Sequence, residues 1–219
     1  MRWLGFLAWL LLIPAVMLTA FLCVAQNGAL YGALQDRTGV TEAVTGVSDE
    51  DRYRLNGALA AYICGEQAEL DDRAAVFGAD QIAFNETERL HMADVRELFA
   101  LARRVCIAVW IGGGCLLAFA VVRGKRLLPG YFAAAGAWAA AALAVIIWAA
   151  SDFTRAFVWF HKMLFTNELW LLNPATDLMI RMLPEAFFAG IAMISAIAMA
   201  AAVALAGAAA WARDWFSKR

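Results

Sequence analysis

Histidine occurs only twice in this chain of 219 residues, at His91 and His161. An unperturbed imidazole titrates near pH 6.5, so it can both accept and donate a proton at neutral pH, and acyl transfer requires both steps. Two imidazoles in one site could therefore act as a base and an acid. The alternative is that both are structural residues, hydrogen-bonded at a membrane interface and without a catalytic role.

The residues around His91 suggest how its ring could be oriented. Glu88 stands three residues before it and Asp94 three residues after it. Residues three apart share one face of a helix, so either carboxylate could hold the imidazole in one tautomer. Asn85 followed by Glu88 is also a capping-box pattern, which predicts the start of a helix. We expect this helix to continue into the apolar stretch that follows.

A metal site is a weaker interpretation. Hydrolytic zinc usually has three protein ligands, and the sequence contains no HExxH motif or paired histidines. Asp94, Asp177 or Glu168 could complete a ligand set only through folding. Three of the four cysteines lie in or beside apolar stretches, so neither a disulfide nor a sulfur-based zinc site is expected. We predict no metal, no cofactor and no nucleic-acid partner.

The elements that must position these residues are apolar. The chain is 63% hydrophobic and 17% charged, and its mean hydropathy is +0.65. Four stretches are free of charge and long enough, at roughly 20 residues, to cross a bilayer as helices. The fold class predicted is an all-α membrane protein with four transmembrane helices and a small extracytoplasmic head domain. An ion transporter is disfavoured, because such proteins usually carry an ionisable residue inside the membrane.

The four transmembrane helices are predicted at 1–26, 105–122, 130–151 and 186–212. The extracytoplasmic parts are a head at 27–104, with helices near 49–66 and 86–104, and a loop at 152–185. The cytoplasmic parts are a loop at 123–129 and a tail at 213–219. A cleaved signal peptide is the alternative for the first span, but its apolar run is longer than the roughly 7–15 residues typical of such peptides.

Charge predicts the orientation. Residues 1–2, 123–126 and 212–219 together carry seven Lys or Arg and one acid. By the positive-inside rule these segments, and with them both termini, lie in the cytoplasm of a multi-pass membrane protein. The remaining segments carry a net charge of −7 and are predicted to face outward. The overall net charge of −1 is therefore the sum of a basic cytoplasmic side and an acidic outer side.

Two outer segments show different patterns. In residues 48–66, Leu55, Leu59, Tyr62 and Ile63 recur on one helical face. Residues 27–47 and 67–84 lack a clear period, and we expect loops or short strands there. Residues 152–184 are rich in aromatic side chains, which favours a helix at the membrane interface, and Pro184 is expected to start the fourth span.

Two blocks around the histidines resemble the bacterial lipoprotein intramolecular transacylases (Lit): FNETERLHMADVRELF at 84–99 and FHKMLFTNELWLLNPATDLMIRMLPEAFF at 160–188. The resemblance implies that diacylated bacterial lipoproteins are the substrate and membrane lipids the surroundings. It also implies that the sn-2 acyl chain moves to the amino group of the lipoprotein's own N-terminal cysteine, leaving a lyso-form lipoprotein. His91 and His161 are then the catalytic pair, on the extracytoplasmic side of the bacterial cell membrane.

Further roles follow from the chemistry of this reaction. An α-amine titrates near about 8, so part of it is neutral and can attack an ester of the same molecule. The developing oxyanion needs hydrogen-bond donors, for which Asn85, Asn167 and Trp170 are candidates. Asp94 and Asp177 are candidates for orienting the imidazoles.

A shared site sets a geometric requirement. A straight, perpendicular helix would place His91 roughly 18 Å above Arg103, so the helix must tilt, bend or sink into the bilayer. Imidazoles more than about 12 Å apart would argue against one site. Two other functions remain open: a non-catalytic protein that binds a lipoprotein or envelope partner, and a metal-dependent membrane hydrolase. The sequence does not determine the oligomeric state.

Overall fold

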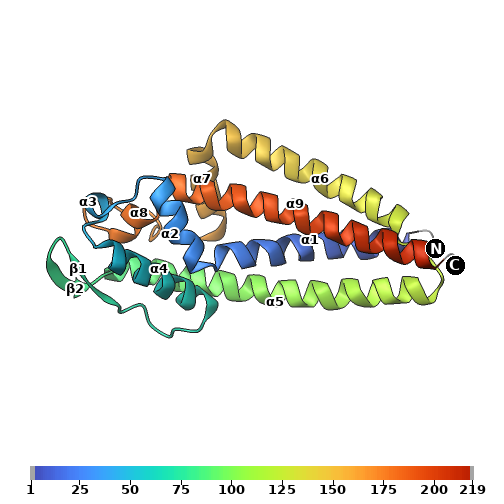
Figure 1. Ribbon diagram of the computed structural model, residues 1–219, viewed down its shortest axis with the longest axis horizontal. Helices are drawn as coiled ribbons and strands as arrows, with labels where there is room; N and C mark the ends of the chain where they lie inside the picture. The colour runs from blue at the N-terminus through green and yellow to red at the C-terminus, as the bar shows by residue number, and fades with distance from the viewer. Residues whose placement is uncertain (1–2, 218–219) are drawn as a thin grey trace. The chain divides into compact units, whose positions relative to one another are not determined.

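The computed structural model describes residues 3–217, which are mostly helical (Figure 1). Three of the basic residues used to predict the orientation, Arg2, Lys218 and Arg219, lie outside the described residues. The elements in chain order are α1 (Leu4–Ala25), α2 (Gly28–Arg37), α3 (Glu42–Thr45), α4 (Asp49–Cys64), β1 (Arg73–Val76), β2 (Ala79–Ile82), α5 (Glu86–Val122), α6 (Leu128–Ser151), α7 (Phe153–Leu164), α8 (Leu178–Met182) and α9 (Glu185–Phe216).

Four helices, α1, α5, α6 and α9, are long and apolar enough to cross a membrane. This confirms the predicted four-span, helical membrane fold. The helix that starts in the capping box does continue into the second span, because α5 is one helix of 37 residues. The sequence predicts that its uncharged stretch from Val105 to Val122 spans the membrane, and the polar residues up to Arg104 precede that stretch. As expected, α9 begins directly after Pro184.

The chain divides into two compact units. The first unit comprises the described residues of 1–22, 102–152 and 195–219. The second unit comprises residues 23–101 and 153–194. The two outer segments that the sequence separates by two spans therefore belong to one compact unit, and both histidines lie in it.

The first unit is a helical bundle in which parts of α1, α5, α6 and α9 share one apolar core. Trp9 and Ile13 of α1 pack with Tyr131 of α6, and the Tyr131 hydroxyl donates to the carbonyl of Val203 in α9 at 2.7 Å. Close approach of α6 to α1 requires a glycine at 130, because a Cβ there would stand 2.5 Å from the carbonyl carbon of Gly5. Small residues thus set the helix spacing, as is usual in membranes.

One end of this bundle is closed by a buried carboxylate. Asp214 of α9 accepts hydrogen bonds from the backbone N–H groups of Leu127 and Leu128 at 2.9 to 3.0 Å. Arg213 donates to the carbonyl of Lys125 at 2.9 Å. The basic loop between α5 and α6 is therefore bound to the end of α9, and α9 extends to Phe216, beyond the predicted end of the span at 212.

The second unit is built on α2 and α4, which pack against each other. The face predicted for α4 is confirmed, since Leu55, Leu59, Tyr62 and Ile63 are all buried in its core. A buried polar network lies beside that core. The amide of Gln35 donates to Asn56 and to the carbonyl of Met182, and its oxygen accepts from the buried Arg52 guanidinium at 2.9 Å.

The expectation of loops or strands in residues 27–47 is wrong, because α2 and α3 form there. Asn27 caps α2 by accepting from the N–H of Leu30. Glycine at 28 and 32 weakens the helical signal, yet tertiary packing favours it at 32, where the Tyr53 ring would stand 1.9 Å from a Cβ. Packing between helices overrides propensity at this position.

Residues 67–84 do contain short strands, which are the only departure from an all-helical fold among residues 3–217. Strands β1 and β2 pair antiparallel, with Arg73 opposite Ile82 and Val76 opposite Ala79. The two residues between them, Phe77 and Gly78, both have positive φ, at 49° and 82°. This is the backbone of the tight turn that matches strand twist in two-residue hairpins.

Candidate active site

The N-terminus of α5 places His91. The predicted capping box is present: the Asn85 side chain accepts from the N–H of Glu88 at 3.1 Å, and the Glu88 carboxylate accepts from the N–H of Asn85 at 2.7 Å. The second carboxylate oxygen of Glu88 accepts from the N–H of Met179, at the start of α8. The first turn of α5 is thereby tied to the segment before α9, and His91 follows one turn later.

His161 lies near the C-terminal end of α7, and its tautomer follows from its hydrogen bond. Its Nδ1 is 2.8 Å from the carbonyl oxygen of Phe157. A carbonyl oxygen can only accept, so Nδ1 must carry the proton and the neutral ring has its lone pair on Nε2. The backbone of α7 therefore leaves Nε2 of His161 available as a base.

The structure brings the two imidazoles together. Their ring centroids are 6.1 Å apart, well within the 12 Å limit for a shared site. Both residues are buried, with 7% and 8% of their surface exposed. Nδ1 of His91 is buried without a hydrogen-bond partner among residues 3–217. A buried, unpaired polar atom is unusual in a folded protein, and a catalytic role or a bound water or ion would explain it.

Aromatic rings enclose the pair. The Trp170 indole stacks on His161 at 5.0 Å between centroids, and Phe157 lies 4.2 Å from the same ring. Phe165 lies 5.3 Å from His91 and 5.8 Å from His161, so it contacts both. The aromatic density of residues 153–170 had indicated a membrane interface. In the folded chain several of these rings surround the histidines, which sequence spacing alone does not reveal.

This apolar enclosure changes the acidity of both rings. Burial, and then the proximity of His161, lower the pKa of His91 to about 4, while the charge of Asp94 acts in the opposite direction. Burial also lowers the pKa of His161, opposed by its hydrogen bond to Phe157. Both imidazoles are therefore neutral at pH 7. They are ready to accept a proton, and the imidazolium of either is a better proton donor than free histidine.

Asp94, Asn167 and Trp170 form a hydrogen-bonded chain between the two histidine-bearing segments. The Asn167 amide donates to the Asp94 carboxylate at 2.8 Å. The Trp170 indole N–H donates to the carbonyl oxygen of Asn167 at 3.0 Å. Asp94 thus binds Asn167 rather than an imidazole, and its effect on His91 is electrostatic.

Asp177 occupies a separate network and does not orient an imidazole in the structure. Its carboxylate accepts from the Asn85 amide at 2.9 Å, from the hydroxyl of Thr176 at 2.7 Å and from the N–H of Asn173 at 2.7 Å. Glu88 is likewise occupied by two backbone N–H groups. Both carboxylates stabilise the junction of α5 with the segment around α8. The sequence pattern could not separate this capping role from contact with an imidazole.

The three predicted oxyanion donors are also engaged. Trp170 has one side-chain N–H, and Asn167 accepts it. Asn85 and Asn167 each use an amide N–H to bind a carboxylate. These bonds support positioning of the histidines, and Asn85 and Asn167 each have a second amide N–H.

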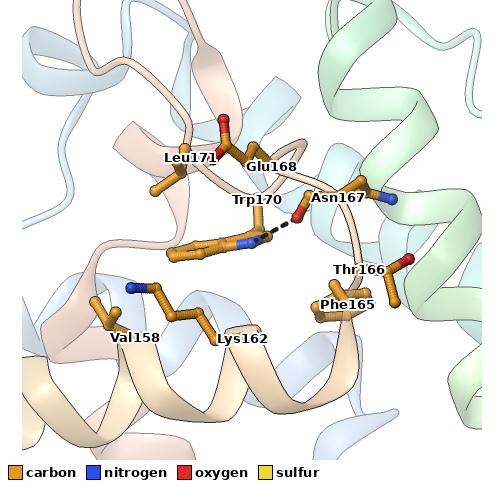
Figure 2. Close-up of a pocket in the computed structure, with 8 residues that line it drawn as sticks. All are labelled: Val158, Lys162, Phe165, Thr166, Asn167, Glu168, Trp170 and Leu171. Atoms are coloured by element: carbon orange, nitrogen blue, oxygen red, sulfur yellow. Dashed lines mark hydrogen bonds between the residues drawn. The ribbon is translucent and has the colours of Figure 1, made fainter.

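A cleft beside the histidines was not foreseen. It has a volume of about 390 Å³ and lies between α7 and the segment that follows it (Figure 2). Its apolar lining comes from Val158, Phe165, Trp170 and Leu171, and its polar lining from Lys162, Thr166, Asn167 and Glu168. Lys162 is the residue next to His161, and that adjacency is the signal that could have drawn attention to it.

No group of three His, Cys, Asp or Glu side chains within residues 3–217 is arranged to hold a metal ion. The four cysteines are free thiols. Among these residues the fold therefore supplies no ligand set for a metal-dependent hydrolase. The effect of a chelator on activity tests that function.

The chain is similar to one known protein family and to solved structures from it. The family model described as lipoprotein intramolecular transacylase Lit matches residues 6–188. Curated proteins give no match. Among solved structures, the membrane-integral lipoprotein intramolecular transacylase Lit of Bacillus cereus is 18% identical, with a TM-score of 0.79 over 100% of this chain and 95% of that one.

Two variants of the Bacillus cereus protein are also similar. In one a histidine is replaced by arginine (TM-score 0.75, 18% identity, 99% of this chain and 94% of that one). In the other it is replaced by alanine (TM-score 0.68, 19% identity, 98% and 90%). At such identities the solved structures show a shared fold.

Proposed function

Because the chain belongs to the lipoprotein intramolecular transacylase (Lit) family, we propose that His91 and His161 are the base and acid of its acyl transfer reaction. The chain is a membrane-integral acyltransferase that acts on lipoproteins. The observation that carries the proposal is that the only two histidines of the sequence lie 6.1 Å apart in one buried, aromatic-lined site.

The acyl donor and acceptor belong to one substrate molecule. The α-amine of the N-terminal cysteine attacks the carbonyl carbon of the sn-2 ester, which forms a C–N bond and a tetrahedral adduct. Collapse of the adduct breaks the bond from that carbon to the glyceryl oxygen. The products are an amide and a free glyceryl hydroxyl, so one proton must leave nitrogen and one must reach oxygen.

His161 is the base in this scheme, because its Nδ1–H is held by Phe157 and its Nε2 lone pair is available. It accepts the proton from nitrogen as the adduct forms. The proximity of the two rings favours a single positive charge in the site, since each charge repels the other. The proton passes to His91, directly or through one water molecule, and from there to the glyceryl oxygen.

The low pKa of His91, about 4, suits the second role. An imidazolium with such a pKa releases its proton readily to a departing alkoxide. Both rings are neutral again at the end, so the site is ready for the next substrate. Intramolecular attack removes the need to activate the amine strongly, and orientation provides much of the rate.

Orientation in the membrane is part of the proposal. The loop 123–127 is bound to the end of α9, and a Cβ added to Gly5 of α1 would stand 3.4 Å from the carbonyl oxygen of Arg126, so the basic segments gather at one end of the bundle. Both termini then lie in the cytoplasm. The residues between spans 1 and 2 and between spans 3 and 4, which carry the histidines, lie outside.

Expression in a bacterium that normally N-acylates its lipoproteins tests the function. Mass spectrometry of N-terminal lipopeptides should detect the lyso form with the wild-type chain. His91→Ala and His161→Ala should each reduce its rate of formation about 10²- to 10⁴-fold. A matched control is Arg37→Glu, which changes an exposed residue of α2.

The outcomes separate the three functions. Unchanged lipopeptides in the presence of correctly inserted wild-type protein would favour a non-catalytic role in binding a lipoprotein or envelope partner. Activity that disappears on chelation and returns with added metal would favour a metal-dependent hydrolase. Full activity in either alanine variant would contradict the histidine pair.

A further inference from the structure

The cleft beside the histidines carries two opposite charges that no other part of the described chain neutralises. Within residues 3–217 neither the Lys162 ammonium nor the Glu168 carboxylate has an ion-pair partner within 4 Å. Figure 2 shows them on opposite sides of the Trp170 indole. The indole lies between the two charges, so a ligand that passes around its edge would meet one charge and then the other.

The cleft shares its walls with the catalytic site. Trp170 lines the cleft and stacks on His161, and Phe165 lines it and contacts both imidazoles. A group bound in the cleft is therefore separated from the two imidazoles by a single aromatic ring. Nδ1 of His91, which is buried and unpaired, is the atom on which the reacting part of the ligand could form a hydrogen bond.

The lining excludes one part of the substrate. An acyl chain packed against Lys162 and Glu168 would remove water from both charges and offer them no hydrogen bonds, which is unfavourable. A lone anionic group would face repulsion from Glu168. A peptide backbone supplies carbonyl oxygens for the ammonium and N–H groups for the carboxylate, and its apolar atoms can contact Val158 and Leu171.

We infer that this cleft binds the peptide that follows the modified cysteine of the lipoprotein, and that Lys162 and Glu168 select it by charge. The inference rests on the proposed function, because it assigns a second region of the same substrate. Lys162 favours acidic side chains in the first few residues, and Glu168 favours basic ones. The volume of about 390 Å³ is enough for a few residues, at the lower end of ordinary ligand sites.

The test uses synthetic diacylated lipopeptides that share one lipid and differ only in the charge of residues two to four: acidic, neutral or basic. The measured quantity is the ratio of kcat/KM for the acidic peptide to that for the basic peptide, with the full-length enzyme in nanodiscs. Lys162→Glu should lower this ratio about five- to tenfold, chiefly through KM. Glu168→Lys should raise it by a similar factor.

Matched controls reverse exposed charges elsewhere in the same unit. Arg37→Glu and Glu69→Lys should leave the ratio within about twofold of wild type. The milder changes Lys162→Gln and Glu168→Gln should shift it in the same directions by smaller factors, which keeps the inference testable if a charge reversal fails to fold. Thermal unfolding identifies such a failure.

Two results would overturn the inference. One is a ratio of kcat/KM for the acidic to the basic peptide that is unchanged in every cleft variant. If wild-type enzyme is active and His161→Ala is inactive in the same assay, the proposed function is still supported. The other is an effect that is equal for all three peptides but depends on exchanging phosphatidylethanolamine for phosphatidylglycerol in the nanodisc. That result would assign the cleft to a lipid headgroup.

Discussion

The Asn167 side-chain amide donates a hydrogen bond to the Asp94 carboxylate at 2.8 Å. This bond joins two segments of the second unit, because Asp94 follows His91 by one helical turn and Asn167 follows His161 by six residues. The backbone carbonyl of Asn167 also holds the Trp170 indole that stacks on His161. We expect the bond to set the separation of the two imidazoles.

Breaking this bond should reduce turnover more than binding. Asp94→Ala and Asn167→Ala should each lower kcat about tenfold with little change in KM, because a displaced imidazole costs proton transfer rather than affinity. The double variant should be no worse than the poorer single variant, since both remove the same bond. Strictly additive losses in this double-mutant cycle would argue against a shared positioning role.

The stacking of Trp170 on His161 predicts a graded response. Trp170→Phe keeps an aromatic face and should retain most activity, losing the indole N–H bond to Asn167. Trp170→Leu removes the ring and should lower kcat about ten- to a hundredfold. Steady-state kinetics on a lipopeptide with neutral residues checks this. Equal losses in both variants would mean that the hydrogen bond, and not the stacked ring, holds His161.

Glu88 is expected to matter for stability. Each of its carboxylate oxygens accepts one backbone N–H, and the residue is buried. Glu88→Gln presents an NH₂ group to one of these donors, so we expect a loss of about 1–3 kcal/mol of unfolding free energy and a lower Tm. Glu86→Gln, an exposed change in the same first turn, is the matched control and should stay within about 0.5 kcal/mol of wild type.

The lowered pKa of His91 predicts that stability falls in mild acid. Its pKa is about 4 in the folded chain and near 6.5 when unfolded, so between these values the unfolded state binds a proton that the folded state does not. The unfolding free energy therefore decreases as pH falls from about 6.5 to 4, by up to about 3 kcal/mol for this group. The shift of His161 has the same sign.

His91→Leu removes that linkage. Its Tm should decline less steeply than that of wild type when both are measured in detergent between pH 7 and pH 4. The carboxylates, which titrate in the same range, are common to both proteins and cancel in the comparison. Parallel Tm curves would show that His91 is not a buried neutral imidazole.

The sequence by itself determined the parts of this protein that depend on local pattern and composition. Four uncharged stretches of about 20 residues specify the spans, because only a helix can satisfy its backbone inside a bilayer. Asn85 and Glu88 specify the start of α5, because a capping box uses atoms three residues apart. The two histidines could be predicted as site residues because they are the only ones in the sequence and lie in the two blocks, 84–99 and 160–188, that resemble the Lit family.

Tertiary structure decided what distant residues do to one another. It placed His91 and His161, 70 residues apart, with their rings 6.1 Å apart, and it directed Asp177 and Glu88 to backbone and amide donors instead of imidazoles. It also turned residues 28–37 into a helix despite their glycines. These outcomes depend on long-range packing, where a hydrogen bond goes to whichever donor folding brings within about 3 Å, and the order of residues along the chain does not specify that donor.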